Sequence, residues 1–234
     1  MIKSRTEGRP LWVKLVLLGV SFGLVVSFVG LGNWQMRRLD WKLDLIDQIE
    51  KRAFLSPQLP PGGAITFQDH AYMRLQVTGR FLHEKTVLVK AVTELGMGYW
   101  VMTPLQSSDQ IIWINRGFVP PSLKSAQQWD QPVSLTPVVG LLRLTEPDGT
   151  LLEANRPEEN RWFSRDIEAM SAQIGLKNVA VYFIDQEKNA NSKAWPRAGL
   201  TVLKFNNPHL SYALTWYAMA LLFAAALVFV IRYR

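Results

Sequence analysis

Two long runs without a charged residue constrain this chain more than any other feature of its sequence. The first covers residues 15–36 and the second covers residues 205–231, which gives lengths of 22 and 27 residues. At about 1.5 Å per residue, helices of these lengths reach about 33 and 40 Å, whereas the hydrocarbon core of a bilayer is about 30 Å thick. The sequence therefore predicts two transmembrane helices, one near each end of the chain.

The first run is longer than the apolar part of a cleaved secretory signal, which typically holds about 7–15 residues. Its far end reads Val-Gly-Leu-Gly-Asn-Trp, which offers no clear processing site of the small-x-small kind. We therefore interpret the first run as an anchor that the mature protein retains.

Charges on the two flanking tails predict the orientation of the chain in its membrane. The cations of the tails are Lys3, Arg5, Arg9, Lys14, Arg232 and Arg234, and the acid is Glu7. The tails therefore carry +5 of the formal net charge of +7, and residues 37–204 are nearly neutral. Because positive flanks favour the cytoplasmic side, we expect both termini in the cytoplasm and residues 37–204 outside it. A net charge of this origin does not indicate nucleic-acid binding.

The residues between the two runs divide into a helical stem and a β-rich domain. Apolar residues recur at helical spacing in residues 37–54, so the first helix is expected to continue as an amphipathic stem until SPQLPPGG ends it. Six alternating segments rich in β-branched and aromatic residues then predict strands: YMRLQVTGRF, TVLVKAV, GYWVMTPL, QIIWINRGFV, VSLTPVVGLLRLTE and VAVYFIDQ. One helix is expected in SRDIEAMSAQIG, with Ser164 as its N-cap.

The predicted fold class is a membrane α+β protein. Two transmembrane helices flank an external antiparallel β-rich domain, a sheet or a small barrel, with one or two helices. The predicted boundaries are a cytoplasmic tail (1–14), a transmembrane helix (15–36), an amphipathic stem (37–54), a periplasmic domain with its return linker (55–204), a second transmembrane helix (205–231) and a cytoplasmic tail (232–234). The chain has no cysteine, so the domain has to be stabilised by its own core and not by disulfides.

No motif in the sequence indicates an enzyme. The chain has no phosphate-binding glycine loop, no zinc-ligand spacing and no serine framed as a nucleophile elbow. Copper binding is not indicated either, because cysteine is absent and the methionines are scattered. We interpret His70 and His83 as solvated surface residues.

Two groups of polar residues in the β-rich domain leave two interpretations open. Asn115, Arg116 and Gly117 favour a strand end that closes through a turn, and the alternative is contact with a partner or substrate. Arg143 and Arg165 suit a propionate or an acidic partner surface, but equally an ordinary surface ion pair.

His209 stands at the beginning of the second apolar run, where lipid gives no reason for a histidine. Asn207 is the expected N-cap of the helix and Pro208 its expected first residue. Tyr212 and Trp216 follow His209 at i+3 and i+7, so the three side chains are expected to share one helix face.

Such a face can bind haem or can belong to the membrane interface. A neutral imidazole can be an axial ligand of haem iron, while aromatic rings line the macrocycle and the small Ala213 and Ala220 let it approach. The alternative is an interfacial aromatic belt that includes a histidine, and the residues alone favour this alternative.

Seven segments, taken in order, change that balance: LGNWQMRRLDWKLDLI, VTGRF, GYWVMTPL, INRGFVP, GLLRLTEP, NRPEENRWFSRD and NPHLSYALTWY. Together they resemble the Surfeit locus protein 1 family, which are inner-membrane assembly factors for cytochrome c oxidase. The resemblance covers nearly the whole chain, including both apolar runs.

The resemblance implies an outward-facing β-rich domain between two membrane helices, working in the biogenesis of the catalytic subunit of the oxidase. Some bacterial members of the family are associated with haem a binding, and the histidine in the family's second span matches His209. The other candidates for contact with a partner or a cofactor are Trp34, Gln35, Asn115, Arg116, Gly117, Arg143 and Arg165.

We therefore expect a non-enzymatic assembly factor that binds haem a and assists its insertion into the catalytic subunit. His209 would bind the haem iron, the only expected metal, with Tyr212 and Trp216 against the ring. The expected partners are cytochrome c oxidase subunit I, haem a synthase as a further candidate, and the lipid bilayer. No Arg- and Ser-rich presequence precedes the first run, which favours a bacterial plasma membrane over a mitochondrion. The alternative function is a protein scaffold that stabilises an oxidase assembly intermediate without binding cofactor.

Overall fold

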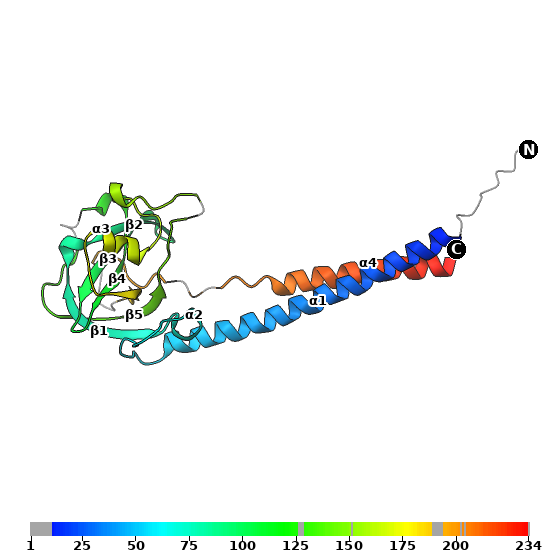
Figure 1. Cartoon of the computed structure of the whole chain (residues 1–234), viewed down its shortest axis with the longest axis horizontal. Coiled ribbons are helices and arrows are strands. Elements are labelled where there is room, and N and C mark those ends of the chain that lie inside the picture. The colour runs from blue at the N-terminus through cyan, green and yellow to red at the C-terminus, as the bar shows by residue number, and fades with distance from the viewer. Residues whose placement is uncertain are drawn as a thin grey trace, which may run out of the picture. The chain divides into compact units, whose positions relative to one another are not determined.

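A computed structural model describes residues 11–125, 129–150, 152–188, 194–201, 203 and 205–233. The chain separates into two units: a helical unit of residues 1–47 and 204–234, and a β-rich unit of residues 48–203 (Figure 1). Most of the predicted N-terminal tail and part of the predicted return linker, residues 189–193, lie outside the described residues.

Two long helices, α1 (Leu11–Phe54) and α4 (His209–Tyr233), correspond to the two apolar runs. Within the described part of the chain, they are the two helices long and apolar enough to cross a membrane. The first run and the predicted stem form one continuous helix of 44 residues. The two apolar helices that the sequence predicts are therefore confirmed, and the stem prolongs the first of them.

Helix α4 begins later than the apolar run, and its start differs from the expected one. The amide of Tyr212 donates to the carbonyl of Pro208 at 3.2 Å, so Pro208 is the residue that begins the helical hydrogen bonding. Asn207 does not cap the helix, because its Oδ1 is buried without a hydrogen-bond partner. The expectation of Asn207 as N-cap is wrong because the helix begins one residue further along the chain.

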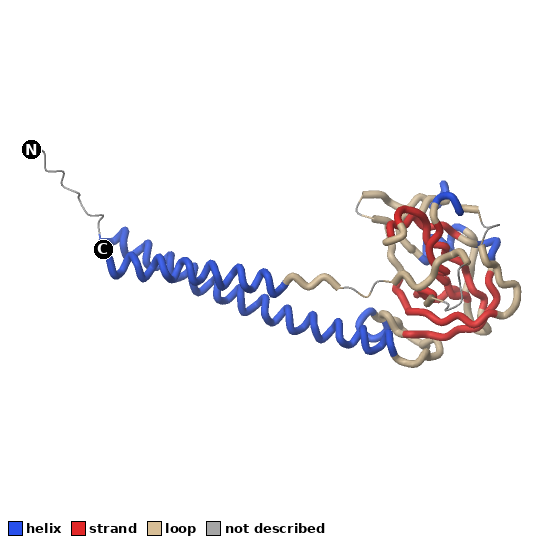
Figure 2. The backbone as a smooth tube through the Cα atoms, turned by 180° about the vertical axis from the view of Figure 1, so that it is seen from behind, coloured by secondary structure: helices blue, strands red, loops and turns tan. Residues whose placement is uncertain are grey.

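The described part of the β-rich unit contains six strands, and each overlaps a segment that the sequence predicts as a strand. They are β1 (Arg74–Phe81), β2 (Val87–Thr93), β3 (Gly96–Gln106), β4 (Ile111–Val119), β5 (Thr136–Leu144) and β6 (Val179–Gln186). Their order is β1-β5-β6-β4-β3-β2, and β1 also pairs with β3. This additional pairing closes a five-stranded barrel with β2 attached outside the ring. Figure 2 shows the strands in red, gathered in the β-rich unit.

One strand pair departs from the antiparallel arrangement that the sequence suggests. Strands β4 and β6 are parallel, with Trp113 opposite Phe183 and Asn115 opposite Asp185, whereas the other pairs are antiparallel. A parallel pair needs a long crossover connection. Here β5 and helix α3 (Ile167–Gln173) lie between the two strands in the sequence.

The barrel strands bury alternate residues in its interior, as strands with one enclosed face do. The interior cluster consists of Leu75, Val77, Phe81, Leu105, Ile112, Ile114, Val138, Leu142, Ala180, Tyr182 and Ile184. A second cluster covers the outer face with Val87, Val89, Met102, Trp113, Trp162, Ile167, Met170 and Phe183. Strands β4 and β6 are therefore buried on both faces, so polar residues at their ends need partners inside the protein.

Helix α3 forms where the sequence predicts a helix, but Ser164 is not its cap. Asp166 is the N-cap, and its side chain accepts a hydrogen bond from the amide of Ala169. Ser164 instead donates to the carbonyl of Glu146 at 2.6 Å and accepts from the amide of Gly149 at 3.0 Å. The chain bends before the helix, which leaves Ser164 in the preceding loop.

Candidate functional site

His209 lies at the first residue of α4, where it contacts α1 within the helical unit. Its Nδ1 lies 2.7 Å from Oε1 of Gln35, a side chain that is 8% exposed. With the Gln35 amide oriented so that its oxygen faces His209, that oxygen can only accept, and the contact corresponds to the tautomer with the proton on Nδ1. The proton on Nδ1 leaves the Nε2 lone pair of the neutral ring available to a ligand.

A second polar contact joins the same two helices. The hydroxyl of Tyr217 donates to Oδ1 of Asn33 at 2.8 Å. Gly32 allows this approach, because a Cβ there would overlap the Tyr217 ring. The stretch Gly-Asn-Trp-Gln of α1 therefore holds α4 through its glycine, its asparagine and its glutamine.

The three residues that the sequence predicts on one face of α4 differ in how far they are covered. Trp216 stacks on Phe28 of α1, with ring centroids 5.6 Å apart and an interplanar angle of 19°. Ala213, between His209 and Trp216 on the same face, is fully buried. Tyr212 is 54% exposed. His209 and Trp216 therefore contact α1, whereas Tyr212 stays largely accessible.

Trp34 and its neighbour Gln35 both match the family pattern. Trp34 is 46% exposed, whereas the Gln35 side chain is buried against α4. The guanidinium of Arg38 lies 5.9 Å from the Trp34 ring and 5.2 Å from the Trp41 ring. Exposed aromatic rings beside a cation are typical of the end of a membrane helix.

Three other predicted residues converge on one buried carboxylate in the β-rich unit. Asp185, 3% exposed, accepts hydrogen bonds from Asn115 at 2.8 Å, from Arg143 at 3.0 Å and from Arg165 at 3.1 Å. Glu146 binds the same two arginines, and its shortest contact is 2.6 Å from Arg165. Two arginines and two carboxylates balance in charge, so this network stabilises the barrel.

The pKa of Arg165 reflects the two carboxylates that face its guanidinium. Burial by itself lowers the pKa of Arg165, but Asp185 and Glu146 raise it above its ordinary value. Sequence reasoning did not single out Asp185, although an acidic residue at the end of the apolar run VAVYFI was a usable indication. The ion-pair interpretation of Arg143 and Arg165 is the one that the geometry supports, with a buried and not a surface carboxylate.

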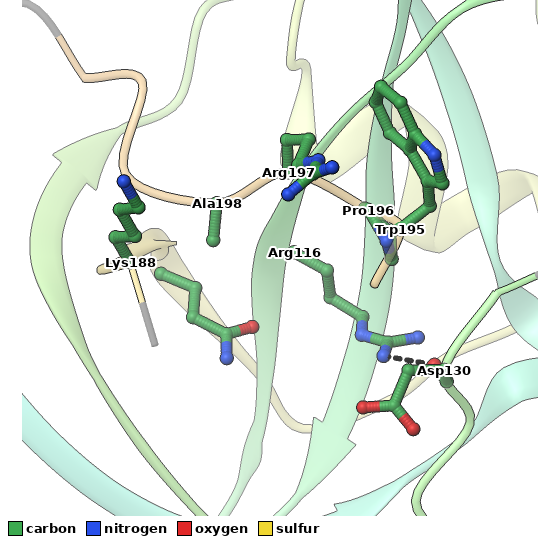
Figure 3. A pocket seen from close by; sticks show the side chains of 8 residues that line it. Arg116, Asp130, Lys188, Trp195, Pro196, Arg197 and Ala198 are labelled. Atoms are coloured by element: carbon green, nitrogen blue, oxygen red, sulfur yellow. Dashed lines mark hydrogen bonds between the residues drawn. The ribbon is translucent and has the colours of Figure 1, made fainter. Parts of the chain in front are cut away.

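Arg116 and Gly117 have contacts of their own, although the amide of Gly117 also donates to Oδ1 of Asn115 at 3.1 Å. The Arg116 guanidinium donates to the carbonyl of Asp130 (Figure 3). It also lies 4.9 Å from the centroid of the Phe81 ring. Gly117 has φ of +121°, and a Cβ there would overlap the carbonyl of Arg197. Gly117 therefore lets the segment around Arg197 pair with the end of β4.

The two remaining histidines have protein partners. Nδ1 of His70 accepts from the amide of Thr66 at 3.2 Å, and Nε2 of His83 lies 3.0 Å from the carbonyl of Pro132. Among the described residues, no group of three or more His, Cys, Asp or Glu side chains is placed to hold a metal ion.

A small β-barrel with a candidate membrane-spanning helix at each end of its sequence defines the class of protein. The SURF1 family model matches residues 22–221 of the chain. The chain therefore belongs to the SURF1 family, which is known as a family of cytochrome c oxidase assembly factors.

Relatives from distant organisms agree with this assignment. The chain is 31% identical to Surfeit locus protein 1 of Rattus norvegicus, over 93% of this chain and 74% of the relative. It is 32% identical to Surfeit locus protein 1 of Homo sapiens, over 93% of this chain and 76% of that relative. It is also 32% identical to a SURF1-like protein of Monosiga brevicollis, over 98% of this chain and 90% of that relative. The family resemblance and the fold class predicted from the sequence are thus both confirmed.

Proposed function

We propose that this protein binds haem a through His209 and assists its insertion into subunit I of cytochrome c oxidase. The observation that carries the proposal is the hydrogen bond from Nδ1 of His209 to Gln35, which leaves Nε2 as the metal-binding nitrogen. When bound, haem a would supply an iron atom that this nitrogen could bind.

The residues around His209 fit an apolar, aromatic ligand. Leu210 and Tyr212 are 49% and 54% exposed, so their side chains are available beside His209. Trp216 and Ala213 already pack in the helix pair, so their part is to hold His209 in place. The tyrosine is therefore the aromatic residue that we assign to the ligand, and the tryptophan is assigned to orientation.

The cellular setting follows from the sequence and belongs to the same proposal. The protein would span a bacterial plasma membrane twice, with both termini in the cytoplasm and the barrel in the periplasm. Subunit I is the proposed recipient of the haem, and haem a synthase is the proposed donor. Neither role requires the protein to catalyse a reaction.

The test is a visible absorption spectrum of the detergent-purified protein, produced together with the enzymes of haem a synthesis. We expect a haem a spectrum in the wild type that is lost or shifted in His209→Ala. His70→Ala and His83→Ala are matched controls, since both histidines have protein partners in the β-rich unit, and their spectra should equal the wild type's. Folded wild-type protein that carries no haem and takes none up on titration would refute the proposal.

A second candidate, a scaffold without cofactor, is favoured by one surface feature. The β2–β3 hairpin exposes Val92, Leu95 and Met97 to 82%, 50% and 76%. Apolar side chains gathered on a hairpin are suited to contact with another protein. Co-purification of subunit I separates the candidates: haem loss with retained subunit I in His209→Ala supports haem binding, whereas a haem-free wild type that retains subunit I supports the scaffold.

A further inference from the structure

Arg116 and Arg165 are both buried arginines in the β-rich unit, but opposite charges compensate their guanidinium groups to different extents. Arg165 contacts two carboxylates, and its pKa lies above the ordinary value. Arg116 is 6% exposed, and it contacts the carbonyl of Asp130 and the face of the Phe81 ring. Its Nε is buried and has no hydrogen-bond partner among the residues that the structure describes.

The charge of Arg116 is therefore only partly compensated. Burial lowers its pKa to about 10, and the carboxylate of Asp130 offsets only part of that effect. A buried cation is costly unless hydrogen bonds and opposite charge surround it. Asp130 thus leaves part of the cost of burying the Arg116 charge uncompensated.

A pocket of about 90 Å³ opens beside this guanidinium (Figure 3). Lys188 and Arg197 also line it, together with the amide of Gln186 and with Asp130. The Arg197 guanidinium lies over the Trp195 ring, 4.9 Å from its centroid. Among the described lining residues, Arg116 and Lys188 therefore share the carboxylate of Asp130 as the acidic group. Pockets for drug-sized ligands have about 300–1,000 Å³, so this pocket can take only a small group.

We propose that the pocket beside Arg116 binds a carboxylate group, either of a small free acid or of an acidic side chain on a partner polypeptide. A carboxylate is planar, accepts several hydrogen bonds and matches the fork of a guanidinium. One such group would give the buried guanidinium of Arg116 a second opposite charge beside that of Asp130. The site lies within the β-rich unit, and its proposal does not depend on haem binding by His209.

The experiment uses the full chain in detergent, labelled with 15N-arginine and titrated with sodium acetate while sodium chloride holds the ionic strength constant. NMR follows the arginine Nε–Hε signals, and the Arg116 signal is identified by its loss in Arg116→Lys. We expect a saturable shift of this signal in the wild type. No saturable shift, or equal affinity for inorganic phosphate, would overturn the proposal.

Variants test whether the pocket itself is responsible. Lys188→Gln removes an exposed cation from the lining and should weaken acetate binding by about two- to fivefold. In Arg116→Lys, which loses the fork, saturable shifts of the other pocket arginine, Arg197, should need about tenfold more acetate. Lys177→Gln removes an exposed cation outside the pocket and should leave the affinity unchanged. If Arg116→Lys does not fold, the acetate affinities of Lys188→Gln and Lys177→Gln still test the proposal. Equal acetate affinity of these two variants would refute it.

A second ligand distinguishes the two sources of the carboxylate. N-acetyl-glutamate α-amide presents a glutamate side chain between two amide groups. Tighter binding than acetate would assign the pocket to a polypeptide side chain, and equal or weaker binding would assign it to a small free acid. Both results support a carboxylate site.

Discussion

Gln35 and His209 are 174 residues apart in the sequence and share a hydrogen bond of 2.7 Å between Oε1 and Nδ1. The bond fixes which nitrogen of the imidazole carries the proton and thereby which nitrogen can bind a metal. A glutamine on the first apolar helix thus determines the chemistry of a histidine on the second.

Replacing Gln35 by leucine should therefore weaken haem binding without removing the proposed ligand. Loss of a hydrogen-bond partner behind a metal-binding histidine typically costs about 10–100-fold in affinity. Titration of haem into detergent-purified Gln35→Leu should show such a loss, and Gln35→Glu, which keeps an acceptor oxygen, should lose less. Ser27→Ala, at an exposed position on the same helix, is the control. An affinity of Gln35→Leu within twofold of wild type would contradict this role.

Asp185→Asn should destabilise the barrel strongly, because it removes one of the two carboxylates that neutralise Arg143 and Arg165. Breaking a buried ion pair from one side costs about 3–5 kcal/mol. Glu159→Gln is the matched control, because Glu159 pairs with Arg161 at the surface and should contribute less than about 1 kcal/mol. Chemical denaturation of both variants measures the difference, and similar losses would show that the network is not important for stability.

Gly117→Ala should destabilise the protein for two separable reasons. Its φ of +121° is unfavourable for alanine, and the added Cβ would overlap the Arg197 carbonyl. Gly175→Ala tests the first effect alone, since Gly175 has φ of +66° and open space around it, and should cost about 1–3 kcal/mol. Gly62→Ala has neither problem and should stay near wild type. Melting temperatures should fall in the order Gly62→Ala, Gly175→Ala, Gly117→Ala, and any other order would contradict the structure.

Tyr182 should give the protein a loss of stability at alkaline pH. Its hydroxyl is buried without a partner, and burial raises the pKa of Tyr182 from 10 to about 12. Between these values the folded state binds more protons than the unfolded state, so stability is fully present below pH 10 and falls as the pH rises toward 12. Urea unfolding across this range should show a smaller loss for Tyr182→Phe than for wild type. Identical pH profiles would argue against this titration.

Local pattern accounts for most of the elements in this fold. The six β segments are recognised by their alternation and their β-branched and aromatic residues, and each of them contains a strand. The acidic residue Asp166 and not Ser164 caps α3, because the choice between neighbouring caps depends on where the preceding loop bends. Such one- or two-residue shifts are set by packing, which sequence periodicity does not report.

The candidate site was predictable only in part. Resemblance to the family pointed to His209 and Gln35, but nothing in the sequence joined them in a hydrogen bond. Helical spacing alone grouped Tyr212 with His209, whereas the position of α1 decides which residues of α4 are covered, and Tyr212 stays largely accessible. Asp185 was missed because its importance comes from three partners on other segments.

The sequence by itself determined the two apolar helices, the six strands and the family, because these depend on runs, periods and motifs within short stretches. Only the tertiary structure decided that β1 meets β3 to close a barrel, that β4 and β6 run parallel, and that Nδ1 of His209 faces Gln35. These pairings join residues far apart in the chain. Their energies depend on the packing of whole surfaces against one another, and no local pattern encodes that packing.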